Sequence, residues 1–264
     1  MIRLILAEGC SAISGVEQLD YKEWSRDPRG QELEYSEHTW PAMLWKEKYP
    51  QAIYYPTARS GSSNGGIRRR VIHYVRHFLN DGYSPEEILV CIQWSSIDRI
   101  EFSRSQTHTI GNRGEFGYEN LNPVYMQSRA SNSKWLKLHR FDNVIKSLYA
   151  NQYLDDDMLY YTYSSIDAVN TFCKSLGIRT IQSAGFEDMF LEVQKPNEFT
   201  QSLIEVNRPH IHYEFHPLNN KHKLGFFQYC NYVLDTKHIG PNGHPLKKGH
   251  QLWYEKIKQW YNIK

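Results

Sequence analysis

The chain has 264 residues, with 31 lysines and arginines against 29 aspartates and glutamates, so its formal net charge at pH 7 is +2. This balance gives no bulk electrostatic reason to expect nucleic-acid binding. The four cysteines, Cys10, Cys91, Cys173 and Cys230, lie far apart without a CxxC pair, which argues against a zinc ribbon or a disulfide framework.

No apolar run approaches the roughly 18 residues that a membrane-spanning helix needs. The first residues also lack the charged and apolar regions of a signal peptide. We therefore expect no membrane partner and an intracellular setting. The length suits one large α/β domain over residues 1–264 or two small ones, and it is enough to bury a sizeable core.

The N-terminal third alternates between strand and helix patterns. Residues 2–7 are almost continuously apolar and are followed by Gly9, which is typical of a buried strand. A short helix is expected at 36–49 and a second strand at 52–58, which leads into the polar, glycine-rich segment 59–66.

The strongest helix pattern begins at Ile67, from which apolar residues repeat at helical spacing until Asp81-Gly82. Its other face is basic, with arginines and histidines at positions 69, 70, 73, 76 and 77, and we expect that face to be solvated. Asn64, at the start of this helix, either caps it or supplies a polar donor, and the capping role is favoured.

The remaining chain continues the alternation around two long excursions. Strands are expected at 88–94 and 178–183, and helices at 135–150, 165–176 and 249–262. Segments 103–134 and 187–240 are rich in turn formers and are expected to be irregular insertions that together form a cap.

Alternating strands and helices predict a mostly parallel sheet of four to five strands with helices on both faces, a three-layer sandwich. In such sheets the site lies beyond the carboxyl ends of the strands. Three short polar segments follow strands directly, and we expect them to meet at this edge: Gly9–Ser11, Gly61–Asn64 and Trp94–Ser96.

These segments, with one more near the C-terminus, resemble in order the sequence blocks of the SGNH (GDSL-like) hydrolases, particularly the phage-type members. Gly9-Cys10-Ser11 matches the first block. The stretch from Trp40-Pro41 to Asn64 matches the second, Gln93-Trp94-Ser95-Ser96 with Arg99 and Glu101 the third, and Asn242-Gly243-His244-Pro245 the last. The matching motifs cover about thirty residues, spread over most of the chain.

The resemblance implies a flavodoxin-like fold and ester hydrolysis without a cofactor. It makes Ser11 the nucleophile and His244 the base. It also implies an oxyanion and substrate-binding group of Gly61, Asn64, Ser95, Ser96 and Arg99, in which Ser95 takes the place of an asparagine. Pro241 and Asn242 stand where the family carries its orienting aspartate, so Asn242, a backbone carbonyl or a carboxylate from elsewhere is expected to hold His244.

The chemistry of these residue types agrees with those roles. A serine hydroxyl is a weak nucleophile until a positioned base takes its proton, so Ser11 needs His244 within hydrogen-bond reach. Gly61 allows close approach of the backbone and a positive φ. The implied substrate is a small acylated or glycan-like molecule, such as an acetylated carbohydrate, and the implied location is the cytoplasm of an infected cell or a virion.

Three alternatives stay open. Gly9-Cys10-Ser11-Ala12-Ile13 nearly matches the GxSxG elbow of α/β-hydrolases, but residue 13 is isoleucine and the segment opens the chain. A metal-assisted phosphoesterase would use the histidine-rich segment, in which His210 and His212 would face the same way on a strand: His210, His212, Glu214, His216 and His222. A third possibility is a non-catalytic carbohydrate- or nucleotide-binding module on the same scaffold.

Overall fold

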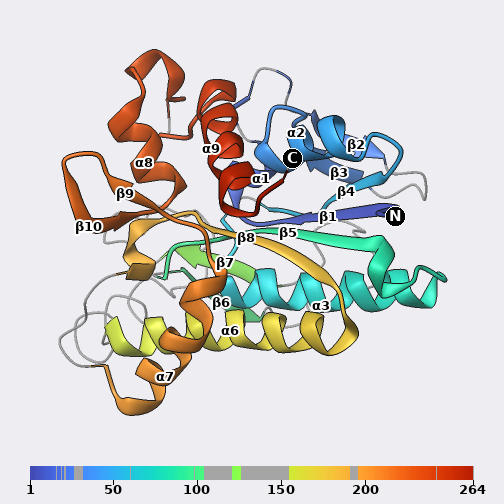
Figure 1. The fold of residues 1–264 in the computed structure, drawn as a ribbon, viewed down its shortest axis with the longest axis horizontal. Coiled ribbons are helices and arrows are strands. Elements are labelled where there is room, and N and C mark those ends of the chain that lie inside the picture. Colours follow the sequence, from blue (N-terminus) through green and yellow to red (C-terminus); the bar gives the residue numbers. More distant parts are fainter. Residues whose placement is uncertain are drawn as a thin grey trace.

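The centre of the molecule is a sheet of four parallel strands in the order β4-β1-β5-β8 (Figure 1). The computed structural model describes residues 1–15, 17–18, 20, 22–26, 32–59, 61–97, 99–103, 121–125, 155–190, 196–241 and 243–263. The strands are β1 Leu4–Glu8, β4 Ile53–Pro56, β5 Ile88–Trp94 and β8 Arg179–Ala184. β4, which follows β1 in the chain among these four strands, lies at the edge of the sheet beside β1, and this is the flavodoxin-like strand order. The predicted α/β sandwich is therefore confirmed.

The register of the strands brings their carboxyl ends to one edge of the sheet. Leu6 of β1 lies opposite Tyr55 of β4 and Val90 of β5, and Glu8 lies opposite Ile92. Both faces of the central strands are covered, which explains why β1 and β5 are apolar runs rather than alternating ones. The segments after β4, β1 and β5 consequently leave the sheet side by side.

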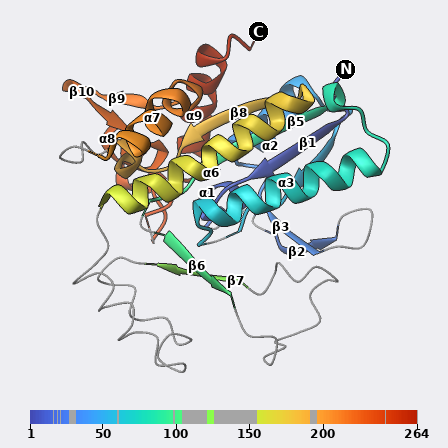
Figure 2. The same ribbon diagram turned by 90° about the horizontal axis from the view of Figure 1, so that it is seen from below.

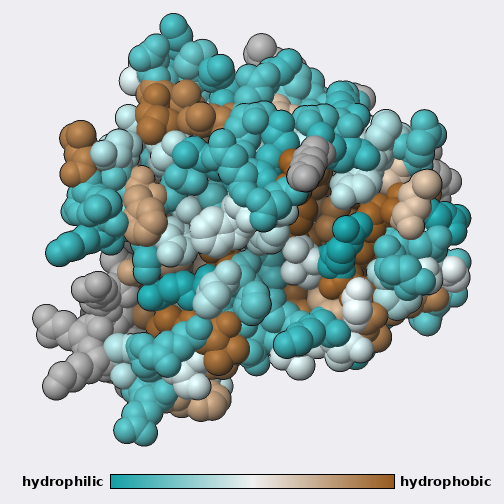
Figure 3. All heavy atoms as spheres, in the orientation of Figure 1, coloured by the Kyte–Doolittle hydropathy of each residue, from teal (hydrophilic) through white to brown (hydrophobic). Residues whose placement is uncertain are grey.

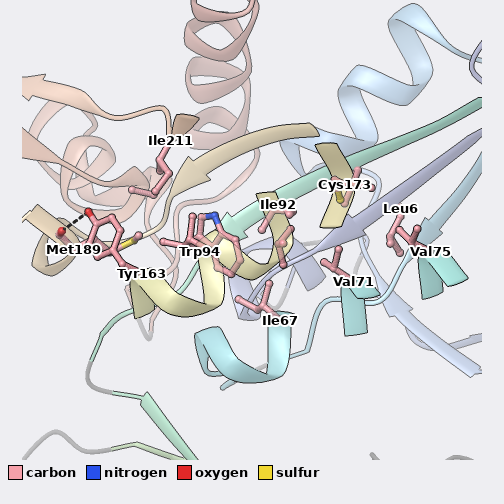
Figure 4. Close-up of a cluster of buried hydrophobic side chains, with 14 of the residues drawn as sticks. Leu6, Ile67, Val71, Val75, Ile92, Trp94, Tyr163, Cys173, Met189 and Ile211 are labelled. Atoms are coloured by element: carbon pink, nitrogen blue, oxygen red, sulfur yellow. Dashed lines mark hydrogen bonds between the residues drawn. The ribbon is translucent and has the colours of Figure 1, made fainter. Parts of the chain in front are cut away.

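Helices α3 (Asn64–Asn80) and α6 (Asp155–Leu176) lie next to each other across one face of the sheet (Figure 2). The predicted apolar stripe of α3 is fully buried there, including Ile67, Val71 and Val75. Trp94 and Ile92 of β5 meet these side chains in the same core (Figure 4), and the Tyr163 hydroxyl of α6 donates to the Met189 carbonyl at 2.9 Å.

The opposite face carries a second core built by helices from both ends of the chain. These are α1 Ser11–Ser14, α2 Trp40–Lys48, α8 Phe226–Val233 and α9 Lys247–Trp260. Trp40 and Trp253 are fully buried between them and the strand residues Ile5 and Cys91. The C-terminal helix is thus packed close to the N-terminal strand, and this is what brings segments near residues 11 and 244 together.

Segment 187–240 is not irregular where the structure describes it. Besides α8 it contains α7 Glu198–Asn207, the strands β9 Glu214–His216 and β10 Asn219–Leu224, and the 3-10 turns Glu187–Phe190, Arg208–His210 and Thr236–His238. Phe226 and Cys230 of α8 are fully buried. The expectation failed because short amphipathic helices among polar turns leave little periodic signal. Whether this segment caps a substrate stays a prediction.

Two further two-stranded antiparallel sheets and one turn complete the described elements: β2 Lys22–Arg26 with β3 Glu32–Tyr35, β6 Arg99–Ser103 with β7 Leu121–Tyr125, and the 3-10 turn Pro85–Glu87. Most of the predicted insertion 103–134 and the predicted helix 135–150 lie outside the described residues. Of the helices that are described, none is both long and apolar enough to cross a membrane. On the face seen in Figure 3, hydrophobic side chains gather over α8 and at the β9–β10 turn, where Leu218 is exposed.

Candidate active site

Ser11 is the first residue of α1, directly beyond the carboxyl end of the central strand β1. Gly9 makes this sharp turn possible, because a Cβ there would lie 2.8 Å from a side-chain carbon of Ile13 and 3.0 Å from the Gln93 carbonyl oxygen. Gly15, with φ +80°, ends the helix in the left-handed conformation. The Ser11 hydroxyl is thereby fixed at the expected edge of the sheet.

His244 lies on the turn that precedes α9, and its Nε2 is 2.6 Å from the Ser11 Oγ. The Gly240 amide donates to the His244 carbonyl at 2.8 Å, which closes the turn. Pro245 packs against Gly249 of α9, where a Cβ would lie only 2.6 Å from the proline ring. The structure thus brings together two residues that are 233 positions apart.

Glu17 is the third member of a hydrogen-bonded array with Ser11 and His244, and the sequence analysis did not identify it. Its Oε2 lies 2.9 Å from the His244 Nδ1, and both side chains are largely buried. An ionised carboxylate can only accept, so the imidazole proton resides on Nδ1 and leaves Nε2 free to accept the Ser11 proton. Glu17 adopts φ +73°, a conformation that is rare outside glycine and is found at functional sites.

The loop that carries Glu17 is held on both sides. The Gln18 side-chain amide donates to the Pro245 carbonyl at 2.9 Å, which joins this loop directly to the histidine turn. Asp20 accepts from the Glu37 amide at 2.9 Å and lies 3.0 Å from the His38 Nδ1. These contacts fix the glutamate in spite of its uncommon backbone conformation.

The position expected for Asn242, at the Nδ1 of His244, is therefore filled by Glu17. Asn242 itself lies outside the described residues. The physical reason is topological, because the loop after α1 runs past the histidine turn and delivers a carboxylate to it. Of the options left open by the sequence, a carboxylate from elsewhere in the chain is the one that the structure contains.

A second histidine lies behind the site. His250 on α9 is fully buried, and its Nδ1 accepts from the Trp40 amide at 3.2 Å. Burial, reinforced by the neighbouring His244 and His38, lowers the pKa of His250 to about 3. It is therefore neutral at ordinary pH and serves as an acceptor that fixes the start of α2.

Glu8, at the end of β1, ties the Ser11 turn to the Gly61 segment. This buried carboxylate accepts from the Gly9 amide at 2.8 Å and from the Thr57 hydroxyl at 2.7 Å. Arg70 of α3 binds it through both Nε (3.0 Å) and Nη2 (2.7 Å), and also donates to the Ser62 hydroxyl. Arg70 was expected on a solvated face, but the buried carboxylate draws its guanidinium inward.

Gly61 is buried and has φ +77°, the conformation for which glycine was expected at this position. The segment is joined to the Ser11 turn by the Arg59 amide, which donates to the Gly9 carbonyl at 3.2 Å. Within the part of the chain that the structure describes, neither the Gly61 amide nor the Ser11 amide donates to another protein group. Both remain available to a ligand oxygen.

Asn64 does not cap α3, because Ser63 does so by accepting from the Gly66 amide. Its side chain instead holds Ser95, with Oδ1 accepting from the Ser95 amide at 2.7 Å and Nδ2 donating to the Ser95 carbonyl at 3.1 Å. Nδ2 also donates to the Thr162 hydroxyl at 3.0 Å, so both of its hydrogens are bound to protein groups. The prediction that Asn64 donates to the substrate is therefore wrong.

Ser95, Ser96 and Arg99 follow β5, on the flank of β1 opposite the Gly61 segment. The Arg99 Nη1 donates to the Ser95 Oγ at 2.7 Å and approaches the Ser62 carbonyl at 3.5 Å. Ser96 turns away from this group, because its hydroxyl donates to Asp188. Ser95 and Arg99 therefore stay beside the candidate site, and Ser96 is used to hold the turn Glu187–Phe190.

An aromatic pair stands next to the histidine. Phe186 and Phe227 are stacked at 4.4 Å between ring centroids, and Phe227 lies edge-on to the His244 ring at 5.6 Å. The Arg99 guanidinium lies 5.0 Å over the Phe186 ring. The two rings form an apolar surface beside His244, and the Arg99 guanidinium adds a positive charge next to it.

The histidine-rich segment does not converge on a point. His210 closes a 3-10 turn rather than lying on a strand with His212, which is buried against Trp253. His216 and His222 stack on each other at 5.9 Å on the β9–β10 hairpin. Among the described residues, no group of three or more histidines, cysteines and carboxylates is arranged to hold a metal ion.

Comparison with known proteins gives likenesses of structure only. No protein-family model matches the chain, and neither does any curated protein sequence. A lipolytic G-D-S-L family protein from Veillonella parvula aligns with a TM-score of 0.46 and 10% identity over 98% of both chains. The esterase EstA from Pseudoalteromonas aligns with a TM-score of 0.46 and 12% identity, over 98% of this chain and 99% of that one.

A third solved structure is a catalytic mutant of an acetylxylan esterase from Geobacillus stearothermophilus. It aligns with a TM-score of 0.48 and 11% identity, over 99% of this chain and 95% of that one. All three of these likenesses are distant, with TM-scores of 0.46 to 0.48 and identities of 10 to 12%.

Proposed function

We propose that this protein is a serine hydrolase that cleaves an ester by acyl transfer through Ser11. The observation that carries the proposal is the continuous hydrogen-bonded array from the Ser11 Oγ to the His244 Nε2, at 2.6 Å, and from the His244 Nδ1 to Glu17, at 2.9 Å. A nucleophile, a base and a group that orients the base, joined in this order, are what such chemistry requires.

In the first half-reaction, Ser11 attacks the ester carbonyl carbon while the His244 Nε2 takes the hydroxyl proton. Glu17 holds the proton on Nδ1 and stabilises the imidazolium that forms. The negative charge on the carbonyl oxygen is met by the amides of Ser11 and Gly61 and by the Ser95 hydroxyl. His244 then gives its proton to the departing alcohol, which leaves an acyl group on Ser11.

In the second half-reaction, His244 takes a proton from water, and the resulting hydroxide attacks the acyl carbon. The tetrahedral intermediate collapses, the carboxylic acid leaves, and the proton returns to Ser11 through Nε2. No cofactor enters either step. The finer proposal for the substrate is a small acylated molecule, such as an acylated carbohydrate, because the ring pair Phe186–Phe227 offers an apolar surface beside the reacting groups.

The test is labelling of the whole chain with a fluorophosphonate, which reacts with activated serines, followed by peptide mass spectrometry. We expect the label on Ser11, and we expect hydrolysis of p-nitrophenyl acetate that S11A abolishes. S175A is the matched control, because the Ser175 hydroxyl only donates to the Phe172 carbonyl at an exposed helix position. Activity that survives S11A contradicts the proposal.

Two other outcomes separate the alternatives. Loss of hydrolysis on addition of a chelator would point to metal chemistry. Binding of acylated sugars without turnover, in a wild-type chain that takes no label, would point to a binding module.

For substrate selection, deletion of residues 106–121, of which all but Leu121 at the start of β7 lie outside the described residues, is expected to spare hydrolysis of p-nitrophenyl acetate and to remove action on larger esters. An unfolded deletion product would contradict the prediction that this segment is a cap.

A further inference from the structure

Ser95 is held more tightly than a turn residue ordinarily is. It follows β5, the strand next to β1, and its backbone amide and carbonyl are both bound by the side chain of Asn64, at 2.7 Å and 3.1 Å. Asn64 is fixed in turn by Thr162 of α6 at 3.0 Å. Because its amide and its carbonyl are both held by Asn64 of α3, only the hydroxyl of Ser95 has freedom to rotate.

The direction of that hydroxyl is set by Arg99. A serine hydroxyl has one proton to donate and two lone pairs with which to accept. The Arg99 Nη1 donates to the Ser95 Oγ at 2.7 Å, and a guanidinium can never accept the proton in return. Among the described residues no acceptor receives the Ser95 proton.

Arg99 is itself positioned by its surroundings. Its guanidinium lies 5.0 Å over the Phe186 ring, and its Nη1 is 3.5 Å from the Ser62 carbonyl in the segment that contains Gly61. The positive charge polarises the Ser95 hydroxyl, which makes it a stronger hydrogen-bond donor. Its place next to Ser62 also aligns the segments on the two flanks of β1.

We propose that Arg99 is a positioning residue that makes Ser95 an obligate donor to the oxyanion, so that a serine and an arginine together perform the task of one amide side chain. The inference rests on the proposed ester hydrolysis at Ser11. The Ser95 hydroxyl contacts the developing charge, and Arg99 acts through it.

The test is a double-mutant cycle on kcat and KM for p-nitrophenyl acetate with S95A, R99A and S95A/R99A. Removing the Ser95 donor is expected to lower kcat about 100-fold with KM little changed. R99A is expected to lower kcat about 10-fold when Ser95 is present and less than about 2-fold in the S95A background, because coupled groups are not additive. Independent, multiplicative losses overturn the proposal.

Restoring an amide provides the second arm. In S95N the carboxamide donates without help, so adding R99A is expected to change kcat by less than about 2-fold. If S95N does not fold, S95T, which keeps the hydroxyl, is expected to stay as dependent on Arg99 as the wild type is. The proposal is overturned if adding R99A to S95N causes a large loss of kcat, or if R99A changes KM alone. Either result indicates that Arg99 contacts the substrate directly.

The matched control is R76A, because Arg76 also lies over a phenyl ring, 5.6 Å from Phe172, but belongs to the outer part of α3. It is expected to leave kcat unchanged. Failure of the proposed function would appear differently, as a wild-type chain whose Ser11 takes no fluorophosphonate. In contrast, if only this inference fails, labelling and turnover persist while the cycle on Ser95 and Arg99 shows no coupling.

Discussion

The Cβ that Gly240 lacks would lie 2.4 Å from the Oε2 of Glu17, the oxygen that binds His244. The glutamate carboxylate thus occupies the space beside a bare backbone position on the histidine turn. Gly240 is needed here for its missing side chain, since its φ is not among the positive values of the chain. The geometry of the array of Ser11, His244 and Glu17 depends on this close approach.

G240A is therefore expected to push the Glu17 carboxylate away from His244 and to lower kcat by about 100-fold, with a smaller effect on KM. The measurement is steady-state hydrolysis of p-nitrophenyl acetate together with the thermal midpoint. G82A is the contrasting control, because Gly82 has φ +90° and open space around it. It is expected to lower stability and leave kcat alone. Equal kcat for G240A and wild type would show that the carboxylate is not needed there.

E17Q is expected to lower kcat roughly 100- to 10,000-fold while the fold is retained. The amide fills the same volume, but it no longer stabilises the imidazolium and can turn its NH₂ group toward Nδ1, which favours the wrong tautomer. E86Q, at an exposed position, serves as the control. N242A is expected to cost far less than E17Q, and the reverse order in kcat would return the orienting role to Asn242.

Loss of Arg70 is expected to destabilise the fold, because it leaves the fully buried Glu8 carboxylate without its cation. R70A should lower the free energy of unfolding by about 3–5 kcal/mol, measured by urea denaturation. It should also lower kcat, since Arg70 links the Ser11 turn to Ser62. The double variant E8L/R70L is expected to recover stability without recovering kcat, and if both recover, the pair has no role in aligning the site.

Stability is expected to fall as the pH drops below about 6.5. Burial lowers the pKa values of His212 and His250 to about 3, so between pH 6.5 and 3 the unfolded chain binds protons that the folded chain does not. Each residue then removes about 1.4 kcal/mol of unfolding free energy per pH unit. H212N should show a shallower dependence in urea titrations from pH 7.5 to 4.5. W260F, which trims a ring beside His212 at 5.0 Å, should leave the slope unchanged.

The parts predicted well from the sequence are those with a periodic or local cause. Ile67, Val71 and Val75 mark the buried face of α3 by their spacing, and the strand Ile88–Trp94 has the predicted bounds. The meeting of Ser11 and His244 was accessible because the turns after parallel strands share one edge and the last helix packs near it.

The parts missed are those in which a polar residue is defined by a partner distant in the chain. Glu17 lies 227 positions from His244, and no sequence spacing relates the two. The one available signal was that Glu17 is a carboxylate on the loop that follows the Ser11 turn. Arg70 shares its helix face with other arginines, and helical periodicity does not say which of them meets a buried charge. Glu8, a carboxylate at the end of an apolar strand, was the available signal, because such a group requires a cation.

The nucleophile and the carboxylate are six residues apart, whereas the base arrives on the turn before the last helix. Two of the three members of the array are therefore placed by local chain geometry, and the third depends on the packing of α9 against the sheet. If α9 detaches by local unfolding, the imidazole leaves both partners at once. Reactivity of Ser11 then reports the docking of the C-terminal helix, and labelling of this one hydroxyl becomes a direct gauge of how often that helix is in place.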